Sequence, residues 1–258
     1  MKNSSFCVCP LASGSKGNSL FVSCGNSSIL IDAGLSGVEI ERRLSLSDID
    51  PESLTAIIIT HEHSDHIKGA GILSRRYKLP LYITQKTYGA CQNLGKIDEL
   101  RFFECGTAFT IDQIQVNPFS ISHDAEDPAG LTLGYKKLKI GIATDLGIAT
   151  TLVKEHLKDC NLLYLEANHD PDMLINGSYP WHLKQRIKGR MGHLSNADAK
   201  ILVSELKTDQ LKHVILAHLS EENNCPQKAA REVSEGLNSS KVDLHVAKPH
   251  EPGRLIRL

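Results

Sequence analysis

The heptapeptide THEHSDH, residues 60–66, comes directly after the apolar run TAIII and decides how this chain is interpreted. Such a run is typical of a strand that is buried on both faces. His61 and His63 are two positions apart on the extended end of that strand and so point the same way. Asp65 and His66 begin a helix, from which their side chains turn back toward the same point. Imidazole and carboxylate together are a ligand set for zinc, iron or manganese. We therefore predict a metal site here rather than a solvated polar turn.

Polar residues at the ends of three later apolar strands predict the rest of this centre. His123 follows a strand that ends near Ile121, Asp145 follows the run IGIAT, and His218 follows the run VILA. Taken alone, each of these residues is also explained as an ordinary surface side chain. Four adjacent ligands suit one ion poorly, so two ions that share a bridging group, with further ligands from elsewhere, fit better. The four strand ends together predict a two-metal site.

The composition is that of an ordinary globular protein. Hydrophobic residues make up 41% and charged residues 23% of the 258 residues. The net charge of −1 predicts no global attraction to nucleic acid or membranes, so contact with nucleic acid would need a local basic patch. The seven cysteines are odd in number and irregularly spaced, which favours reduced thiols. Neither a signal-like start nor an apolar stretch near the roughly 20 residues of a membrane span is present, so we expect a cytoplasmic protein without membrane contact.

Short strands in quick succession, followed by alternating strands and helices, predict two sheets packed face to face with helices on their outer faces. No linker or composition break divides the chain, and we expect one domain over residues 1–258. The expected strands are 6–11, 19–23, 28–32, 55–60, 81–84, 100–104, 113–120, 131–135, 138–143, 161–167, 212–217 and a final one at 242–247. The expected helices are 36–46, 65–77, 148–158, one or two within 170–189, 195–206 and 226–236.

The pattern of His-x-His-x-Asp-His followed by separate His, Asp and His resembles the metallo-β-lactamase superfamily. More narrowly, the chain resembles the YycJ/WalJ-like branch of that superfamily, which is related to ribonuclease Z. The stretches that carry this resemblance span nearly the whole chain: SGSKGN (13–18), ILIDAG (29–34), HEHSDH (61–66), LEANHD (165–170), GHLSN (192–196) and LAHLSEENN (216–224). The resemblance implies an α/β (α+β) fold, the four-layer αββα sandwich, and a hydrolase closer to nucleases and phosphodiesterases than to lactamases.

Carried over by position, the resemblance also implies a role for each site residue. It implies that His61, His63 and His123 hold the first metal, that Asp65, His66 and His218 hold the second, and that Asp145 bridges them. Asp32 resembles the carboxylate that orients a ligand histidine. His193 matches a histidine near the scissile phosphate of ribonuclease Z-like proteins and would protonate the leaving oxygen. The alternative for His193 is an ordinary residue before a helix capped by Ser195.

Three further features are candidate substrate contacts. The loop 13–18, with Ser15 and Asn18, has glycines and amides suited to a phosphate, although a plain tight hairpin explains it equally. The stretch 182–190 is locally basic and suits a nucleic-acid backbone, or is simply a solvated helix face. Its candidate contacts are Lys184, Arg186, Lys188 and Arg190. Tyr179 and Trp181 beside it would stack on a base or serve packing, and His169 would reach the site or support it.

These residues predict a hydrolase that uses a hydroxide bridging two divalent ions, Zn, Mn or Fe, as its nucleophile. Asp65 would also orient the attacking water, although its role as a ligand competes for the same oxygens. The favoured activity is that of a nuclease or phosphodiesterase on nucleic acid, with a DNA exonuclease favoured by the resemblance. The alternatives are a hydrolase of a small ester, thioester or lactam on the same ions, and a non-catalytic metal or redox protein. DNA versus RNA, the direction of cleavage, the native metal and the oligomeric state stay open.

Overall fold

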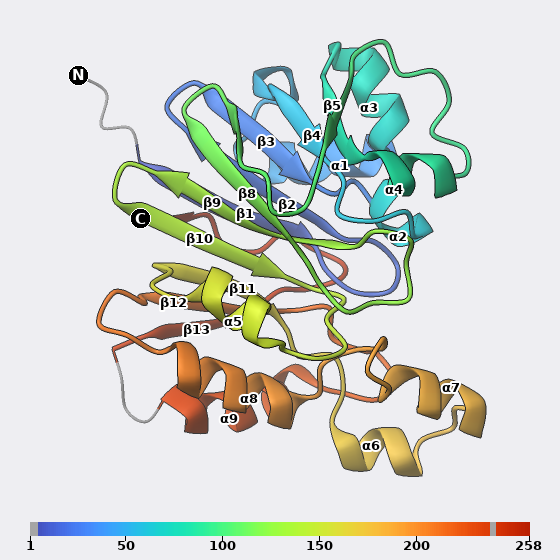
Figure 1. The fold of residues 1–258 in the computed structure, drawn as a ribbon, viewed down its shortest axis with the longest axis vertical. Helices are drawn as coiled ribbons and strands as arrows, with labels where there is room; N and C mark the ends of the chain where they lie inside the picture. Colours follow the sequence, from blue (N-terminus) through green and yellow to red (C-terminus); the bar gives the residue numbers. More distant parts are fainter. Residues whose placement is uncertain (1–4, 238–240) are drawn as a thin grey trace.

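Two seven-stranded sheets pack face to face in the computed structural model, which describes residues 5–237 and 241–258 (Figure 1). The first sheet has the order β14 (Ile256–Arg257), β1 (Phe6–Ala12), β2 (Ser19–Cys24), β3 (Ser27–Ile31), β4 (Ala56–Ile58), β5 (Leu81–Thr84) and β6 (Leu100–Phe103). The second has the order β13 (Asp243–Val246), β12 (His213–Ala217), β11 (Leu162–Glu166), β10 (Leu138–Ala143), β9 (Ala129–Tyr135), β8 (Ile114–Ser120) and β7 (Phe109–Ile111).

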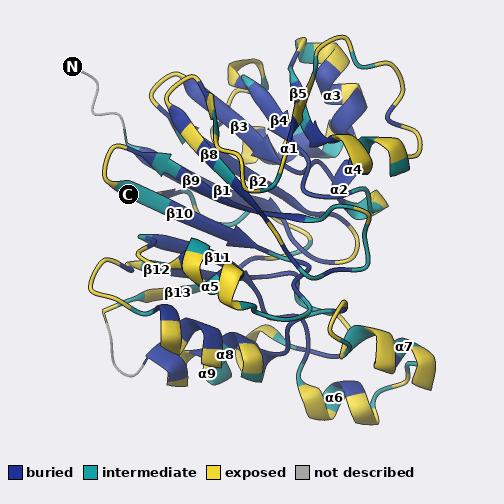
Figure 2. Cartoon of the chain, in the orientation of Figure 1, coloured by how far each residue is buried: buried dark blue, intermediate teal, exposed yellow. Residues whose placement is uncertain are grey.

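Helices cover the outer face of each sheet (Figure 1). On the side of the first sheet lie α1 (Gly37–Leu46), the 3-10 helix η1 (Pro51–Ser53), α2 (Ser64–Ile67), α3 (Ala70–Tyr77) and α4 (Gln85–Ala90). The second half of the chain adds α5 (Thr151–Leu157), α6 (Pro171–Asn176), α7 (Trp181–Ile187), α8 (Asn196–Leu206) and α9 (Pro226–Leu237). Figure 2 shows that α6 and α7 project beyond the sandwich and are largely exposed. In the described residues, no helix has both the length and the apolar character needed to span a membrane.

Three apolar cores lie between the four layers and explain the nearly continuous apolar strands. One core lies between the sheets, a second lies under α1 and α3, and a third lies under α5, α8 and α9. Along β11, Leu162 and Tyr164 face the core between the sheets, whereas Leu163 and Leu165 face the helices. Because both faces of the strand are buried, the positions from Leu162 to Leu165 all carry hydrophobic side chains. The predicted four-layer sandwich is confirmed.

The central strands of each sheet run parallel, so the turns after them gather at one edge of the sandwich, called here the functional edge. In the first sheet β3, β4, β5 and β6 pair in parallel, and in the second β10, β11, β12 and β13 do so. The carboxyl ends of parallel strands meet at the same edge of a sheet, where their following turns come together. In Figure 1 this is the end of the molecule at which α2 and α7 lie.

Most predicted elements are present, but the single helix expected over 65–77 is wrong. It is divided into α2 and α3 at Gly69, whose amide donates to the carbonyl of Ala33 (2.7 Å) instead of continuing the helix. This close backbone contact overrides the helical pattern. The chain also does not end with a strand at 242–247, because β14 returns to pair with β1 in the first sheet. The elements η1, α4 and β7 were not predicted.

Gly69 gives a test of how tightly α2 is held against the sandwich. A Cβ atom at this position would lie 2.4 Å from the carbonyl oxygen of Leu35, so Gly69→Ala must displace backbone. We expect this variant to lower the free energy of unfolding by about 1–3 kcal/mol, as overpacking usually does. The control is Gly89→Ala in α4, where a Cβ meets nothing within 4 Å and alanine should be neutral or slightly stabilising. Urea denaturation of both variants measures the difference, and equal stabilities would contradict it.

Candidate metal centre

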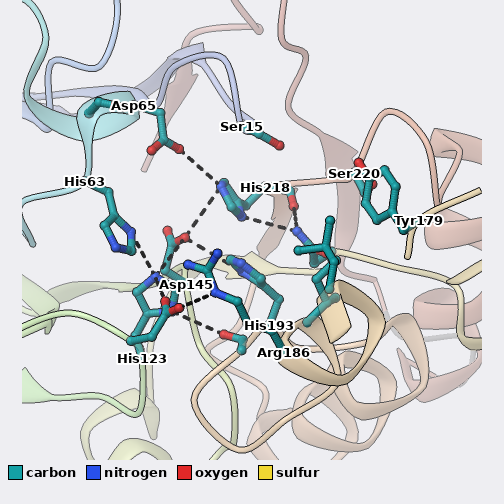
Figure 3. Close-up of a pocket in the computed structure, with 16 residues that line it drawn as sticks. Ser15, His63, Asp65, His123, Asp145, Tyr179, Arg186, His193, His218 and Ser220 are labelled. Atoms are coloured by element: carbon teal, nitrogen blue, oxygen red, sulfur yellow. Dashed lines mark hydrogen bonds and ion pairs between the residues drawn. The ribbon is translucent and has the colours of Figure 1, made fainter. Parts of the chain in front are cut away.

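The predicted ligands converge at the functional edge, and several of them are drawn in Figure 3. Each one lies just after a strand or in the short helix behind it. His61 and His63 follow β4, Asp65 and His66 lie in α2, His123 follows β8, Asp145 follows β10 and His218 follows β12. These residues form overlapping groups of three or more, within each of which one ligand atom per residue lies within 4.8 Å of the others. Both sheets therefore contribute to one cluster.

The first group consists of His61, His63 and His123. Nδ1 of His63 lies 3.1 Å from Nε2 of His61 and 3.3 Å from Nε2 of His123. His61 and His123 are each 1% exposed, and His63 and His123 both lie on the wall of a pocket. Three ring nitrogens that converge in this way can share one cation, because neutral imidazole presents a lone pair to it.

The second group consists of Asp65, His66 and His218. Oδ2 of Asp65 lies 3.6 Å from Nε2 of His66 and 3.7 Å from Nε2 of His218. Asn18 supports the group from the loop after β1, because its Nδ2 donates to Oδ2 of Asp65 (3.1 Å). One carboxylate and two imidazoles again form a ligand set for a transition-metal ion.

Asp145 lies between the two groups. Its Oδ2 is 3.3 Å from Nε2 of His66, and its Oδ1 is 3.5 Å from Nε2 of His218 and 3.7 Å from Nε2 of His123. Although both are buried, Oδ2 of Asp145 and Nε2 of His218 have no hydrogen-bond partner among the described residues. Buried polar atoms are usually satisfied, so these unpaired atoms fit ligands of a metal ion. The cluster thus has the donor chemistry of a divalent-metal centre.

Three residues of the centre have a left-handed backbone at the end of a strand. The φ angles are 61° at Asp32 after β3, 56° at Asp145 after β10 and 54° at His218 after β12. Non-glycine residues adopt this conformation at a cost of order 1–3 kcal/mol, and they cluster at functional sites. At His218 the amide donates to Oγ of Ser13 (2.7 Å), which holds the turn in place. The sharp reversal directs each side chain into the centre instead of along the sheet.

Asp32 holds the ligand His66 from behind. Its Oδ2 lies 2.8 Å from Nδ1 of His66, and its two oxygens accept from the amide and hydroxyl of Thr60 at 2.8 Å each. A carboxylate bound to one ring nitrogen fixes the direction of the other, which faces the cluster. This geometry is what the proposed orienting role of Asp32 requires.

Glu166, which was not among the predicted site residues, holds the candidate ligand His218 from the second sheet. It is fully buried at the end of β11, and its Oε1 lies 2.9 Å from Nδ1 of His218 and 2.8 Å from Nδ1 of His193. Its Oε2 accepts from the amides of Leu146 (2.7 Å) and Leu194 (3.0 Å). A signal existed in the sequence, because Glu166 ends the apolar run LLYLE in the same way that Asp145 and His218 follow theirs.

The carboxylates of the centre attract protons as well as metal ions. Burial by itself disfavours charge on both His66 and His218. Asp32 and Asp145 nevertheless raise the pKa of His66 well above its ordinary value, and Asp145 is the main group that raises the pKa of His218 to about 10. A ligand imidazole must be neutral, so metal ions that bind here displace these protons.

The cluster opens into a pocket of about 330 Å³. Besides five of the predicted ligands, its walls include Ser15, Tyr179, Arg186, His193 and Ser220 (Figure 3). His193 is held through Nδ1 by Glu166, and no hydrogen bond to its Nε2 is found in the part of the chain that the structure describes. This leaves one nitrogen of His193 for a substrate beside the metal ligands.

The loop 13–18 is both a tight turn and part of the pocket. The amides of Gly14 and Gly17 are used inside the loop, by Oδ1 of Asn18 (2.8 Å) and by the carbonyl of Gly14 (2.9 Å). Those two amides are therefore not available to a phosphate. Ser15 lines the pocket, whereas Asn18 is buried and supports Asp65.

The basic stretch 182–190 does not act as one surface. Lys184 is 9% exposed, and its Nζ donates to the carbonyls of Ile175 (2.8 Å) and Gly177 (2.7 Å) at the end of α6. The expectation that Lys184 contacts nucleic acid is therefore wrong, because unpaired carbonyls at a helix end attract its charge. Arg186 reaches the pocket, where its Nε donates to Oδ2 of Asp124 (2.5 Å).

The remaining candidates lie around the pocket. Lys188 and Arg190 are exposed and line a neighbouring hollow of about 320 Å³. Nζ of Lys188 lies 5.4 Å from the ring centroid of Trp181, which is 61% exposed. His169 is buried and outside the pocket lining, and its carbonyl accepts from the amide of Asn196 at the start of α8. Its position suits support of the turn that carries His193.

Comparison with known proteins places the chain in a family. The model of the β-lactamase superfamily domain matches residues 27–219. Exodeoxyribonuclease YycJ of Bacillus anthracis is 38% identical over 254 residues, which cover 95% of this chain and 96% of that protein. Exodeoxyribonuclease WalJ of Streptococcus pneumoniae is 40% identical over 224 residues, which cover 85% and 83% of the two chains.

A solved structure supports the fold independently. The crystal structure of the metallo-β-lactamase fold protein YhfI from Bacillus subtilis is similar with a TM-score of 0.76 and 17% identity, over 99% of this chain and 100% of that one. At this identity the likeness shows the fold alone. From the matched domain, its two relatives and the histidine–aspartate cluster, we conclude that the chain belongs to the β-lactamase superfamily and is a metal-dependent hydrolase.

Proposed function

We propose that this hydrolase cleaves phosphodiester bonds in nucleic acid, with DNA exonuclease activity favoured. The observation that carries this proposal is His193, which is anchored by Glu166 and faces a pocket that also holds the metal ligands and Arg186. Metal ligands, a proton donor and a cation at one pocket are the parts that phosphodiester hydrolysis needs. The two relatives named exodeoxyribonucleases favour DNA as the substrate.

We infer that the centre binds two divalent ions, of zinc, manganese or iron. The residues proposed for the first ion are His61, His63 and His123, those for the second are Asp65, His66 and His218, and Asp145 is shared. When bound, such ions supply Lewis acidity and lower the pKa of water to near neutrality. Asp65 lines the pocket, which suits its carboxylate for orienting the attacking water as well.

His193 is the proposed general acid. Cleavage of a phosphodiester leaves an alkoxide unless a proton reaches the leaving oxygen. Burial opposes charge on His193, but the ionised carboxylate of Glu166 outweighs it and raises the pKa of His193 above its ordinary value. A raised pKa increases the fraction of His193 that is protonated, and therefore able to donate, at neutral pH.

The substrate is proposed to enter along α7. Arg186 and the hydroxyls of Ser15 and Ser220 face the pocket and suit phosphate oxygens. Outside the pocket, Lys188 and Arg190 continue the positive charge. The exposed ring of Trp181 offers a surface on which an unpaired base can stack. These contacts favour a strand end with unpaired bases over a small ester.

Two broader expectations remain proposals. We propose that residues 1–258 act as one domain, because the apolar core between the two sheets includes residues of both. We also propose that the protein works in the cytoplasm, in keeping with cysteines that are all free thiols.

The number of ions at the centre can be tested by removing one ligand from each group. His63→Ala and Asp65→Ala should each bind one ion fewer than the parent protein, and the double variant should bind two fewer. Each should lower phosphodiesterase activity at least about 10²-fold, since charge stabilisation in the transition state is lost. Metal analysis after chelation and reloading with zinc or manganese gives the counts, with the exposed His250→Ala as control. A double variant that loses only one ion would indicate a single-metal centre.

The proton donor can be tested by the pH dependence of kcat. His193→Gln should lower kcat about 10²–10⁴-fold without changing the metal content. In the parent protein, activity should be lost as pH rises through the raised pKa of His193, because the neutral ring cannot donate. Glu166→Gln removes the charge that raises this pKa, so the alkaline limb should move to lower pH.

The matched control for Glu166→Gln is Asp32→Asn. Asp32 also orients a ligand histidine but makes no hydrogen bond to His193, so its loss should lower activity without moving the alkaline limb. If both variants move the limb equally, or neither does, His193 is not the acid.

The substrate path can be tested through salt dependence. Lys188→Ala/Arg190→Ala should weaken cleavage of single-stranded DNA and spare a small phosphodiester such as bis(p-nitrophenyl) phosphate. The slope of log(kcat/KM) against log(salt) should become shallower by about 0.7 per lost contact. The control is Arg231→Ala, an exposed arginine on α9. Unchanged cleavage of DNA would exclude this path, and loss of both activities would point to a structural defect instead.

A further inference from the structure

A second group of metal-type side chains lies at the opposite end of the second sheet from the candidate centre. His213 begins β12, Asp243 begins β13, and His245 is two residues further along β13. His213 pairs with Asp243 across the two parallel strands, and Ile215 pairs with His245. Residues at i and i+2 of a strand share a face, so the three polar side chains lie on one face. It is the face on which Ile215 packs between the sheets.

This group is separate from the candidate centre. His213 is the first residue of β12, whereas His218 follows the end of the same strand. Five residues of extended chain span roughly 16 Å, which is beyond the reach of shared ligands. No residue of the group lines the pocket of the candidate centre.

The ligand atoms of the group converge. One atom from each of His213, Asp243 and His245 lies within 4.8 Å of the other two. Nδ1 of His213 is 3.6 Å from Oδ2 of Asp243, and the two histidine rings have centroids 5.8 Å apart. Nδ1 of His213 and Nε2 of His245 are both buried, yet neither has a hydrogen-bond partner in residues 5–237 and 241–258. Two unpaired ring nitrogens beside a carboxylate call for a common ligand.

The surroundings decide which kind of ligand fits. The three residues line a hollow of about 190 Å³ together with Arg254 and Arg257 from the C-terminal segment. Asp243 is exposed, so water can fill the remaining coordination positions. The arginines disfavour a cation held by charge alone, as Mg²⁺ or Ca²⁺ would be. Imidazole nitrogen instead selects zinc and its neighbours, which bind through the lone pair of a neutral ring.

We propose that His213, Asp243 and His245 bind one ion of the zinc class and thereby tie β13 to β12. β13 is the edge strand of the second sheet and pairs with β12 on one side only. An ion with ligands on both strands holds this edge strand to its neighbour in the folded state. Because the ion binds the folded state alone, it stabilises that state. This inference does not depend on the proposed substrate or on the number of ions at the candidate centre.

The first test uses the unmodified chain and a readout other than activity. The protein is stripped with a chelator, and zinc is then added while the imidazole ¹H–¹⁵N NMR signals are followed. We expect the signals of His213 and His245 to shift or broaden at micromolar zinc, while that of the exposed His250 stays unchanged. Signals of His213 and His245 that do not respond, or that respond only together with His250 at millimolar zinc, would overturn the proposal.

The second test compares two variants that each lose one imidazole. His245→Gln should bind one zinc ion fewer than the parent and lose part of the rise in Tm that zinc produces, with hydrolase activity unchanged. His250→Gln should match the parent in zinc content and in Tm. A folded His245→Gln protein with the zinc content of the parent would contradict the site. If His245→Gln does not fold, the NMR titration of the unmodified chain decides.

Discussion

The fully buried carboxylate of Glu166 is the interaction on which the rest of the site depends. An ionised carboxylate away from water is costly unless several donors surround it. Glu166 receives them from the backbone after β10, from the backbone before α8, and from the rings of His193 and His218. Burial opposes its ionisation, but the rings of His193 and His218 lower its pKa to about 2. One side chain thus joins three segments of the chain and sets the direction of His193 and of the candidate ligand His218.

In the first sheet, Asp32 is the buried carboxylate that is surrounded by donors. This carboxylate, 4% exposed at the end of β3, binds Thr60 after the neighbouring β4 and the ring of His66 in α2. In each sheet, therefore, a carboxylate at the end of an apolar strand holds a ligand histidine from a neighbouring segment. Asp145 lies 3.3 Å from His66, which Asp32 holds, and 3.5 Å from His218, which Glu166 holds. The metal centre is the place where these two halves of the fold meet.

Rigidity at the strand ends contrasts with the exposure of the substrate side. The candidate ligands are anchored by buried hydrogen bonds, whereas α6 and α7 project from the sandwich (Figure 2). The exposed Trp181 and Arg186 both lie on α7. Lys184 fastens α7 to the end of α6 through two carbonyls, which fixes where Arg186 reaches the pocket. In the proposed function, hydrolytic chemistry and substrate choice would lie on different parts of the structure, as in other folds that support many activities.

Local spacing in the sequence was sufficient to predict which residues form the histidine–aspartate cluster. The 60–66 run concentrates four metal-type residues after a buried strand, and the periodicity of apolar residues placed His123, Asp145 and His218 at the ends of others. Strand ends are local features, so the pattern around each residue reveals them. The parallel order of the central strands brings these strand ends together. The four-layer fold that contains these strands was predicted from the pattern of elements and from the family resemblance.

Only the tertiary structure decided the parts that depend on contacts between distant segments. Glu166 looked like any last residue of a strand until its four donors, from three other segments, were in place. Lys184 looked like its basic neighbours, but the end of α6 takes up its charge. The division of the 65–77 helix follows from the hydrogen bond between Gly69 and Ala33. The spacing of apolar residues along the helix gives no sign of this contact. Residue type and spacing determine which chemistry is possible, whereas burial and hydrogen bonding across the fold determine which residues perform it.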